Sequence, residues 1–200
     1  MTAHAPSRIR RRSAAWSPAL GVGLIAALVA APHVPGGSLR AESVAEPLDY
    51  RTSDYRSPVP ATLKGARVVT AAEAKALHDG KGAVFIDVYP RPPKPPNLPA
   101  GTVWRDPKHV SIEGAHWLPN VGYGVLAPEP AAYLAARLEQ LTGGDKSRPL
   151  VFFCLKDCWM SWNAARRALA MGYTSVVWFP EGTDGWQALG LALAEVQPVP

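Results

Sequence analysis

The two cysteines of this 200-residue chain, Cys154 and Cys158, lie four positions apart in the stretch PLVFFCLKDCWM. If both were helical, four helical rises would separate their Cα atoms by about 6 Å, a distance that a disulfide accepts. So short a loop is a weak stabilising cross-link, because it removes little entropy from the unfolded chain. A functional pair of thiols is therefore the better interpretation.

The residues around Cys154 favour a role as nucleophile. An apolar run ends at this cysteine and a helix begins by about Ser161, so the turn between them can direct backbone N–H groups at the sulfur or at an attached anion. Lys156 adds a positive charge, most of which Asp157 cancels. Cys158 would be the resolving thiol, attacking a persulfide or mixed disulfide on Cys154. The alternatives are an inert buried thiol at 154 and an apolar filler at 158.

The elements that must position this turn alternate between strand and helix. Helices are expected at 70–77, 128–144, 161–173 and 182–190, between apolar runs of strand character at 67–69, 82–89, 113–119, 149–154, 175–179 and 191–196. This order predicts an α/β fold with a parallel sheet and helices on both faces. Cys154 would then lie at the carboxyl end of a central strand, where open α/β sheets bind ligands.

Residues 1–41 have the pattern of a secretory signal peptide, with arginines between positions 8 and 12, an apolar stretch, and a cleavage site ending at Ala41. The protein is therefore expected in the periplasm, where neighbouring thiols tend to be oxidised. An uncleaved signal would be its only attachment to a membrane. Five of the 21 Lys and Arg precede Glu42, so the remaining chain, with 16 Asp and Glu, has no net charge. A nucleic-acid partner is not expected.

Three further regions follow the expected signal peptide. Residues 42–66 are expected to form an extended N-terminal arm, which either wraps the domain or is a flexible linker. The domain itself is expected at 67–197. Within it, 89–114 is a Pro-rich insertion, with six prolines between Pro90 and Pro99. It predicts a polyproline-like surface loop, which either docks a partner or is a rigid insertion.

Several segments, in order, make the chain resemble a single-domain rhodanese over roughly residues 66–195. They are VTAAEAKAL, AVFIDV, HVSIEGAHWLP, LVFFC, NAARRALAMGYTSVVWF and EGTDGW. The resemblance implies that Cys154 accepts sulfur, that Asp87 is a supporting residue at the end of the sheet and that Trp186 is a packing residue. Trp117 and Tyr123 are expected to line the pocket. The substrate-binding loop would comprise, besides the two cysteines, Leu155, Lys156, Asp157, Trp159 and Met160.

This loop departs from the pattern C-R-x-G-x-R of a typical sulfurtransferase. Leu155 and Trp159 stand where the family has arginine, and Asp157 stands in place of glycine. An anionic donor such as thiosulfate would lose charge-assisted contacts worth about 1.5–3 kcal/mol each. Ordinary thiosulfate:cyanide chemistry is therefore not expected. A related phosphatase activity is excluded, because Met160 occupies the position of its essential arginine.

The segments CLKDCWMSWNAARRALAMGY, GTDGW and WLPNVGYG resemble more closely an exported rhodanese-like group associated with PQQ-dependent alcohol catabolism. That group is named for a CxxCW motif, whereas this chain has one residue more, C-x-x-x-C-W. The resemblance implies a role in periplasmic alcohol oxidation, with a PQQ-dependent alcohol dehydrogenase or its cytochrome c as partner. No cofactor of its own is expected.

Two other functions compete with thiol chemistry. The Cys-x-x-x-Cys spacing also suits copper delivery, in which Cys154 and Cys158 would bind soft Cu(I) with Met160, His109 or His116 as a third ligand. Alternatively, the chain is a non-catalytic module that binds a partner through its Pro-rich loop and a tryptophan-rich rim. Exposed tryptophans would favour binding and buried ones would favour packing; the residues concerned are Trp104, Trp117, Trp159 and Trp162.

Overall fold

The computed structural model describes residues 44–200. The expected signal peptide, 1–41, and the first two residues of the expected arm lie outside this range. No helix within 44–200 is long and apolar enough to cross a membrane.

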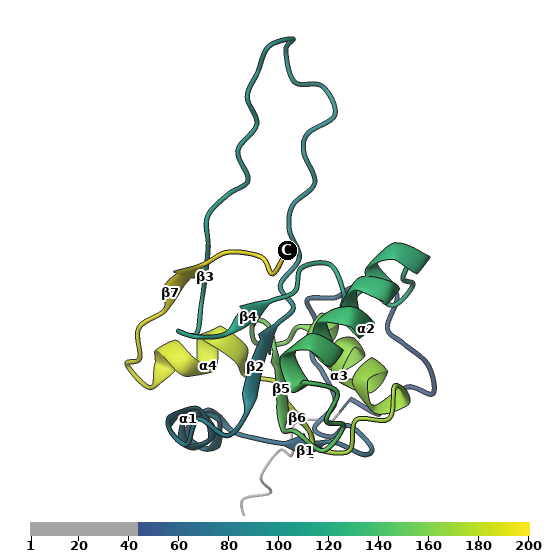
Figure 1. The fold of residues 1–200 in the computed structure, drawn as a ribbon, viewed down its shortest axis with the longest axis vertical. Coiled ribbons are helices and arrows are strands. Elements are labelled where there is room, and N and C mark those ends of the chain that lie inside the picture. Colours follow the sequence, from purple (N-terminus) through teal and green to yellow (C-terminus); the bar gives the residue numbers. More distant parts are fainter. Residues whose placement is uncertain (1–43) are drawn as a thin grey trace, which may run out of the picture. The chain divides into compact units, whose positions relative to one another are not determined.

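A five-stranded parallel sheet forms the centre of the domain (Figure 1). Its strand order is β1-β6-β5-β2-β4, with β5 in the middle. The apolar runs of the sequence form these strands because each middle strand is covered on both faces, and all four residues of β2, β5 and β6 are buried. The strands are β1 (Arg67–Val68), β2 (Val84–Asp87), β4 (His116–Trp117), β5 (Leu150–Phe153) and β6 (Val176–Phe179).

Four helices in the described chain cover the two faces of the sheet: α1 (Ala71–Asp79), α2 (Pro128–Thr142), α3 (Trp159–Ala170) and α4 (Gly182–Ala188). Successive residues of a strand face opposite sides of the sheet and therefore belong to two different hydrophobic cores. Phe152 belongs to the core beneath α2 and α3, whereas Phe153 belongs to the core beneath α1 and α4. Figure 1 shows the same division, with the two helix pairs on opposite sides of the sheet. The prediction of an α/β fold with helices on both faces is confirmed.

Local sequence signals explain where α1 begins and where α2 ends. Thr70 caps α1 in a reciprocal capping box with Glu73, as the sequence predicted. Helix α2 ends at Gly143, which has a left-handed φ of 66°.

A separate two-stranded antiparallel ladder joins β3 (His109–Ser111) to β7 (Ala194–Val196). Here the structure differs from the sequence analysis, which assigned 109–111 to the surface loop and the last strand to the parallel sheet. The prolines of the insertion stop at Pro107, so the following residues have free N–H groups and can pair with the end of the chain. The rest of the insertion extends away from the sheet as a long loop (Figure 1).

The described part of the arm, 44–66, runs along α3. Asn163 clamps it, accepting from the Arg51 N–H at 3.0 Å and donating to the Arg51 carbonyl at 2.9 Å. One turn later, Arg166 donates to the carbonyl groups of Pro47 and Asp49, both at 3.0 Å. The arm therefore covers the helix that follows the two cysteines.

The beginning of α4 lies directly against the loop that follows β5. The Thr183 N–H donates to the Cys154 carbonyl at 2.9 Å, and Gly182 has a φ of +53°. A side chain at Gly182 would be strained, and its Cβ would overlap that same carbonyl oxygen. This contact requires glycine at position 182.

Replacing Gly182 with alanine should therefore lower the free energy of unfolding by about 2 kcal/mol or more, because strain and overlap act together. Gly190→Ala is the matched control, because Gly190 also has a positive φ of +75° but has open space around it. Strain alone should cost about 1 kcal/mol there. Urea unfolding of both variants measures the difference, and equal losses would contradict the proposed overlap.

Candidate functional site

The two thiols lie together at the carboxyl end of the central strand. Cys154 follows the last residue of β5, and Cys158 is the N-cap of α3. Between them, Asp157 has a left-handed φ of 54°, which turns the chain back on itself. Both cysteines are free, with side chains only 1% and 3% exposed, and their Sγ atoms are 2.6 Å apart. A disulfide, with sulfurs about 2.05 Å apart, can form with little movement of either side chain.

The backbone of the loop is held by two distant segments. The Lys156 N–H donates to the Asp184 carboxylate at 2.8 Å, and the Trp159 N–H donates to the Tyr55 carbonyl at 2.9 Å. Two backbone N–H groups of this turn are therefore already engaged by other segments of the chain. Sequence reasoning missed both contacts because no local spacing signals them.

The environment of Cys158 favours its thiolate form. A hydrogen bond from Cys154 lowers the pKa of Cys158, and so do the backbone N–H groups of Met160 and Leu155 and the charge of Arg56. Burial acts in the opposite direction but does not prevail. This combination of a helix N-terminus and a nearby cation is the ordinary means of stabilising a thiolate.

Cys154 has the opposite environment. Burial raises the pKa of Cys154 well above its ordinary value, and Cys158 and the Asp87 carboxylate raise it further. Asp87 is fully buried at the end of β2, where it accepts hydrogen bonds from Ser111 Oγ at 2.6 Å and from the Tyr89 N–H at 2.8 Å. The pair therefore ionises first at Cys158, and the resulting thiolate accepts a hydrogen bond from the Cys154 thiol.

The imidazole ring of His109 lies beside the end of the sheet and contacts the same Asp87 carboxylate. His109 Nε2 lies 2.8 Å from Asp87 Oδ2, and its ring lies 5.0 Å from the Tyr89 ring and 4.3 Å from the Trp117 ring, centre to centre. From the sequence, His109 was considered as a third copper ligand and Asp87 as a support of the sheet end, with no contact between the two. The signal that could have joined them is the short segment HVS beyond the prolines, which brings His109 and Ser111 to Asp87.

A pocket of about 300 Å³ opens between the base of the Pro-rich loop and α4. Trp117 lines this pocket, whereas Tyr123 lines a different hollow and packs edge-on against Tyr55. The loop contributes only Leu155, and neither cysteine lines the pocket. Among its other lining residues are Tyr89, His109, Thr183, Asp184, Gln187 and Leu193.

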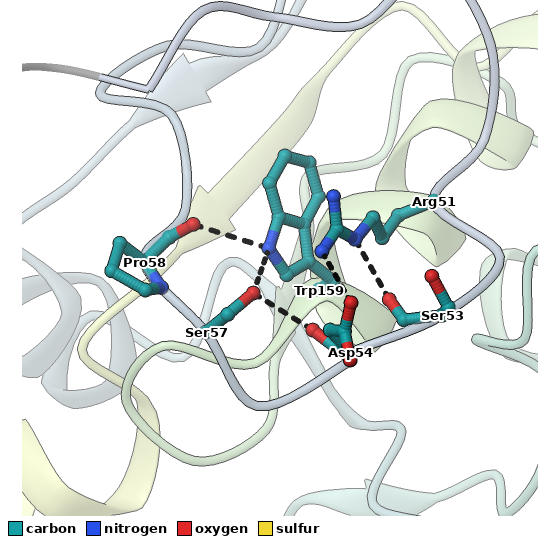
Figure 2. Close-up of polar contacts among 6 residues, drawn as sticks. All are labelled: Arg51, Ser53, Asp54, Ser57, Pro58 and Trp159. Carbon is teal, nitrogen blue, oxygen red and sulfur yellow. Dashed lines mark hydrogen bonds and ion pairs between the residues drawn. The ribbon is translucent and has the colours of Figure 1, made fainter.

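The arm fixes Trp159, the residue that follows Cys158. Trp159 Nε1 donates to Ser57 Oγ at 3.0 Å and to the Pro58 carbonyl at 3.2 Å. The Arg51 guanidinium lies over the indole ring, 5.3 Å from its centre, and pairs with Asp54. Figure 2 shows this enclosure, in which the arm residues surround the tryptophan. The first turn of α3 is thus held from outside the sheet.

The two competing functions gain little from this geometry. The part of the chain that the structure describes contains no group of three His, Cys, Asp or Glu side chains able to hold a metal ion, so the two sulfurs lack such a third ligand. Three of the four rim tryptophans are buried, which favours packing: Trp117, Trp159 and Trp162.

The two thiols should titrate in a fixed order. In Cys154→Ser, the remaining Cys158 keeps its helix N–H groups and its nearby arginine, whereas in Cys158→Ser the remaining Cys154 stays buried beside Asp87. A lower pKa means that thiolate is present at lower pH, so Cys154→Ser should titrate at a lower pH than Cys158→Ser. Ultraviolet thiolate absorbance, with the double variant as baseline, measures both. The reverse order would contradict the assignment.

Comparisons with known proteins give a family. Residues 70–189 match the rhodanese-like domain. No curated protein matches the chain.

Similar solved structures include a thiosulfate sulfurtransferase from Pseudomonas aeruginosa, with 21% identity and a TM-score of 0.46 over 66% of this chain and 21% of that one. A rhodanese-like domain from Anabaena sp. has 14% identity and a TM-score of 0.41, over 67% and 81% of the two chains. Because the family match itself spans more than half of the sequence, this chain belongs to the family of rhodanese-like domain proteins.

Proposed function

We propose that this protein performs sulfur transfer or thiol–disulfide chemistry, with Cys154 as the sulfur-accepting residue and Cys158 as the resolving thiol. The observation that carries the proposal is the pair of free, buried sulfurs 2.6 Å apart on the loop after the central strand. Membership of the rhodanese-like family supports sulfur as the group transferred.

In the first step, Cys154 attacks the outer sulfur of an organic persulfide, RSSH, and the thiolate RS⁻ leaves. The Cys154 thiol gives up its proton to the Cys158 thiolate, 2.6 Å away, and Cys154 becomes a persulfide. In the second step, Cys158 attacks Sγ of Cys154, and the outer sulfur leaves with the bonding electrons and two protons as H₂S. The transferred sulfur is reduced and the two thiols are oxidised to a disulfide. An external dithiol must reduce this disulfide before another turnover.

The same pair suits exchange with a partner's disulfide. Cys154 would attack one sulfur of that disulfide and Cys158 would resolve the mixed disulfide, so that the partner leaves reduced. For both reactions we expect a substrate, persulfide or disulfide, that is not strongly anionic. The loop has no arginine, and the Asp184 carboxylate already takes one of its amides. These features disfavour thiosulfate.

The cellular setting that we propose is the periplasm, in the service of alcohol oxidation by a PQQ-dependent dehydrogenase or its cytochrome c. The signal-peptide pattern of residues 1–41 supports export. The resemblance around CLKDCWMSWN to an exported group associated with PQQ-dependent catabolism supports the pathway. The proposed thiol chemistry itself needs no cofactor.

The mechanism predicts different failures for the two cysteine variants. With an organic persulfide and no reductant, the wild-type chain should release sulfide once per chain and become a disulfide. Cys158→Ser should stop at a Cys154 persulfide, seen in the intact mass as one added sulfur atom. Cys154→Ser should do neither, with the double variant as background.

Other outcomes would change the assignment. Persulfide on Cys158 in the Cys154→Ser variant would reverse the two roles. If no persulfide donor reacts but a protein disulfide is reduced by the wild-type chain alone, the exchange reaction would replace sulfur transfer. Failure of both reactions would overturn the proposed function.

A further inference from the structure

The arm meets the cysteine loop in one antiparallel backbone pair, Arg56 opposite Cys158. One residue beyond the pair on each segment, the Trp159 N–H donates to the Tyr55 carbonyl at 2.9 Å. This pattern marks the non-hydrogen-bonded position of an antiparallel ladder, where facing side chains leave on the same side and approach most closely. The side chain of Arg56 therefore leaves the arm beside that of Cys158.

The arm is anchored on both sides of Arg56. Before it, the Tyr55 hydroxyl accepts a hydrogen bond from the Gly124 N–H at 3.0 Å. After it, Ser57 Oγ accepts from Trp159 Nε1 at 3.0 Å and donates to the Asp54 carbonyl at 2.8 Å (Figure 2). The backbone that presents the guanidinium is thus fixed relative to the first turn of α3.

The charged groups near the thiol pair are arranged asymmetrically. The Asp87 carboxylate acts on Cys154 and the Arg56 guanidinium acts on Cys158. Arg56 has no carboxylate partner within residues 44–200, unlike Arg51, which pairs with Asp54. In the loop and at α4 the remaining groups are one cation and two anions: Lys156, Asp157 and Asp184.

We propose that Arg56 is a positioning residue of the thiol site, which stabilises negative charge on Cys158 from the side of the arm. The proposal rests on the function proposed above and adds to it the source of positive charge. The loop's own cation, Lys156, is next to Asp157 and so contributes little net charge. The cation that faces the resolving sulfur comes instead from a segment about one hundred residues earlier in the chain.

The chemistry uses this charge at two points. Before the first step, Arg56 stabilises the Cys158 thiolate that accepts the proton of Cys154. In the second step, Cys158 becomes a thiolate again as it attacks Sγ of Cys154, and Arg56 lowers the barrier by facing the developing charge. No bond to Arg56 forms or breaks, and its proton stays in place.

A charge series at position 56 tests the proposal in the full chain. Arg56→Gln should raise the pH midpoint of thiolate formation by about 0.5 unit and slow sulfide release about threefold below that midpoint. Arg56→Glu should give roughly twice the pH shift, and Arg56→Lys should stay near wild type because it keeps the charge. Lys64→Gln is the matched control. It removes one exposed positive charge from the same arm, and Lys64 is not among the groups that act on Cys158.

Two readouts separate this proposal from the proposed function. Thiolate absorbance needs no turnover, so the titration still tests Arg56 even if the wild type neither releases sulfide nor reduces a protein disulfide, the outcome that would overturn the proposed function. Equal midpoints for Arg56→Gln and Lys64→Gln would overturn the role of Arg56. An equal loss of rate in Arg56→Lys and Arg56→Gln, without a pH shift, would mean that the residue only shapes the arm, and would overturn it too.

Discussion

The site depends on one constraint: the three residues between Cys154 and Cys158 must reverse the chain tightly enough to leave two sulfurs 2.6 Å apart. The left-handed Asp157 makes the turn, and Gly182 lets α4 lie against it. Burying two neutral thiols is inexpensive, but a buried thiolate needs compensation. Helix N–H groups and a cation on the Cys158 side supply it, which explains why the two sulfurs are chemically unequal.

Much of the fold could be predicted because its signals are local. Apolar runs of strand length became the middle strands, the Thr70 capping box opened α1, and Gly143 closed α2. The ladder of β3 with β7 could not be predicted. Each strand has only three residues, and they come from a Pro-rich insertion and from the chain end, so only tertiary packing pairs them.

The cysteine pair itself was visible in the sequence, since spacing and position after a strand suffice to select it. What surrounds the pair was not. The loop amides are taken by Asp184 and Tyr55, and Asp87 is joined to His109 across the insertion. Such partners lie about twenty to one hundred residues away, and no periodicity links them. Tyr123 likewise lines a hollow apart from the pocket that Trp117 lines, a separation that no local pattern signals.

The arm gives this site a property that the family's loop alone would not have. The same segment both covers the first turn of α3, through Trp159, and presents Arg56 to Cys158. If a substrate or partner displaces the arm, the thiols become more accessible while the cation that favours the thiolate moves away. Water that reaches the thiols would offset this loss, because burial itself raises the pKa of Cys158. The arm therefore exerts two opposing influences on Cys158: its cover helps to bury the thiol, which raises the pKa, and its Arg56 supplies a charge that lowers it.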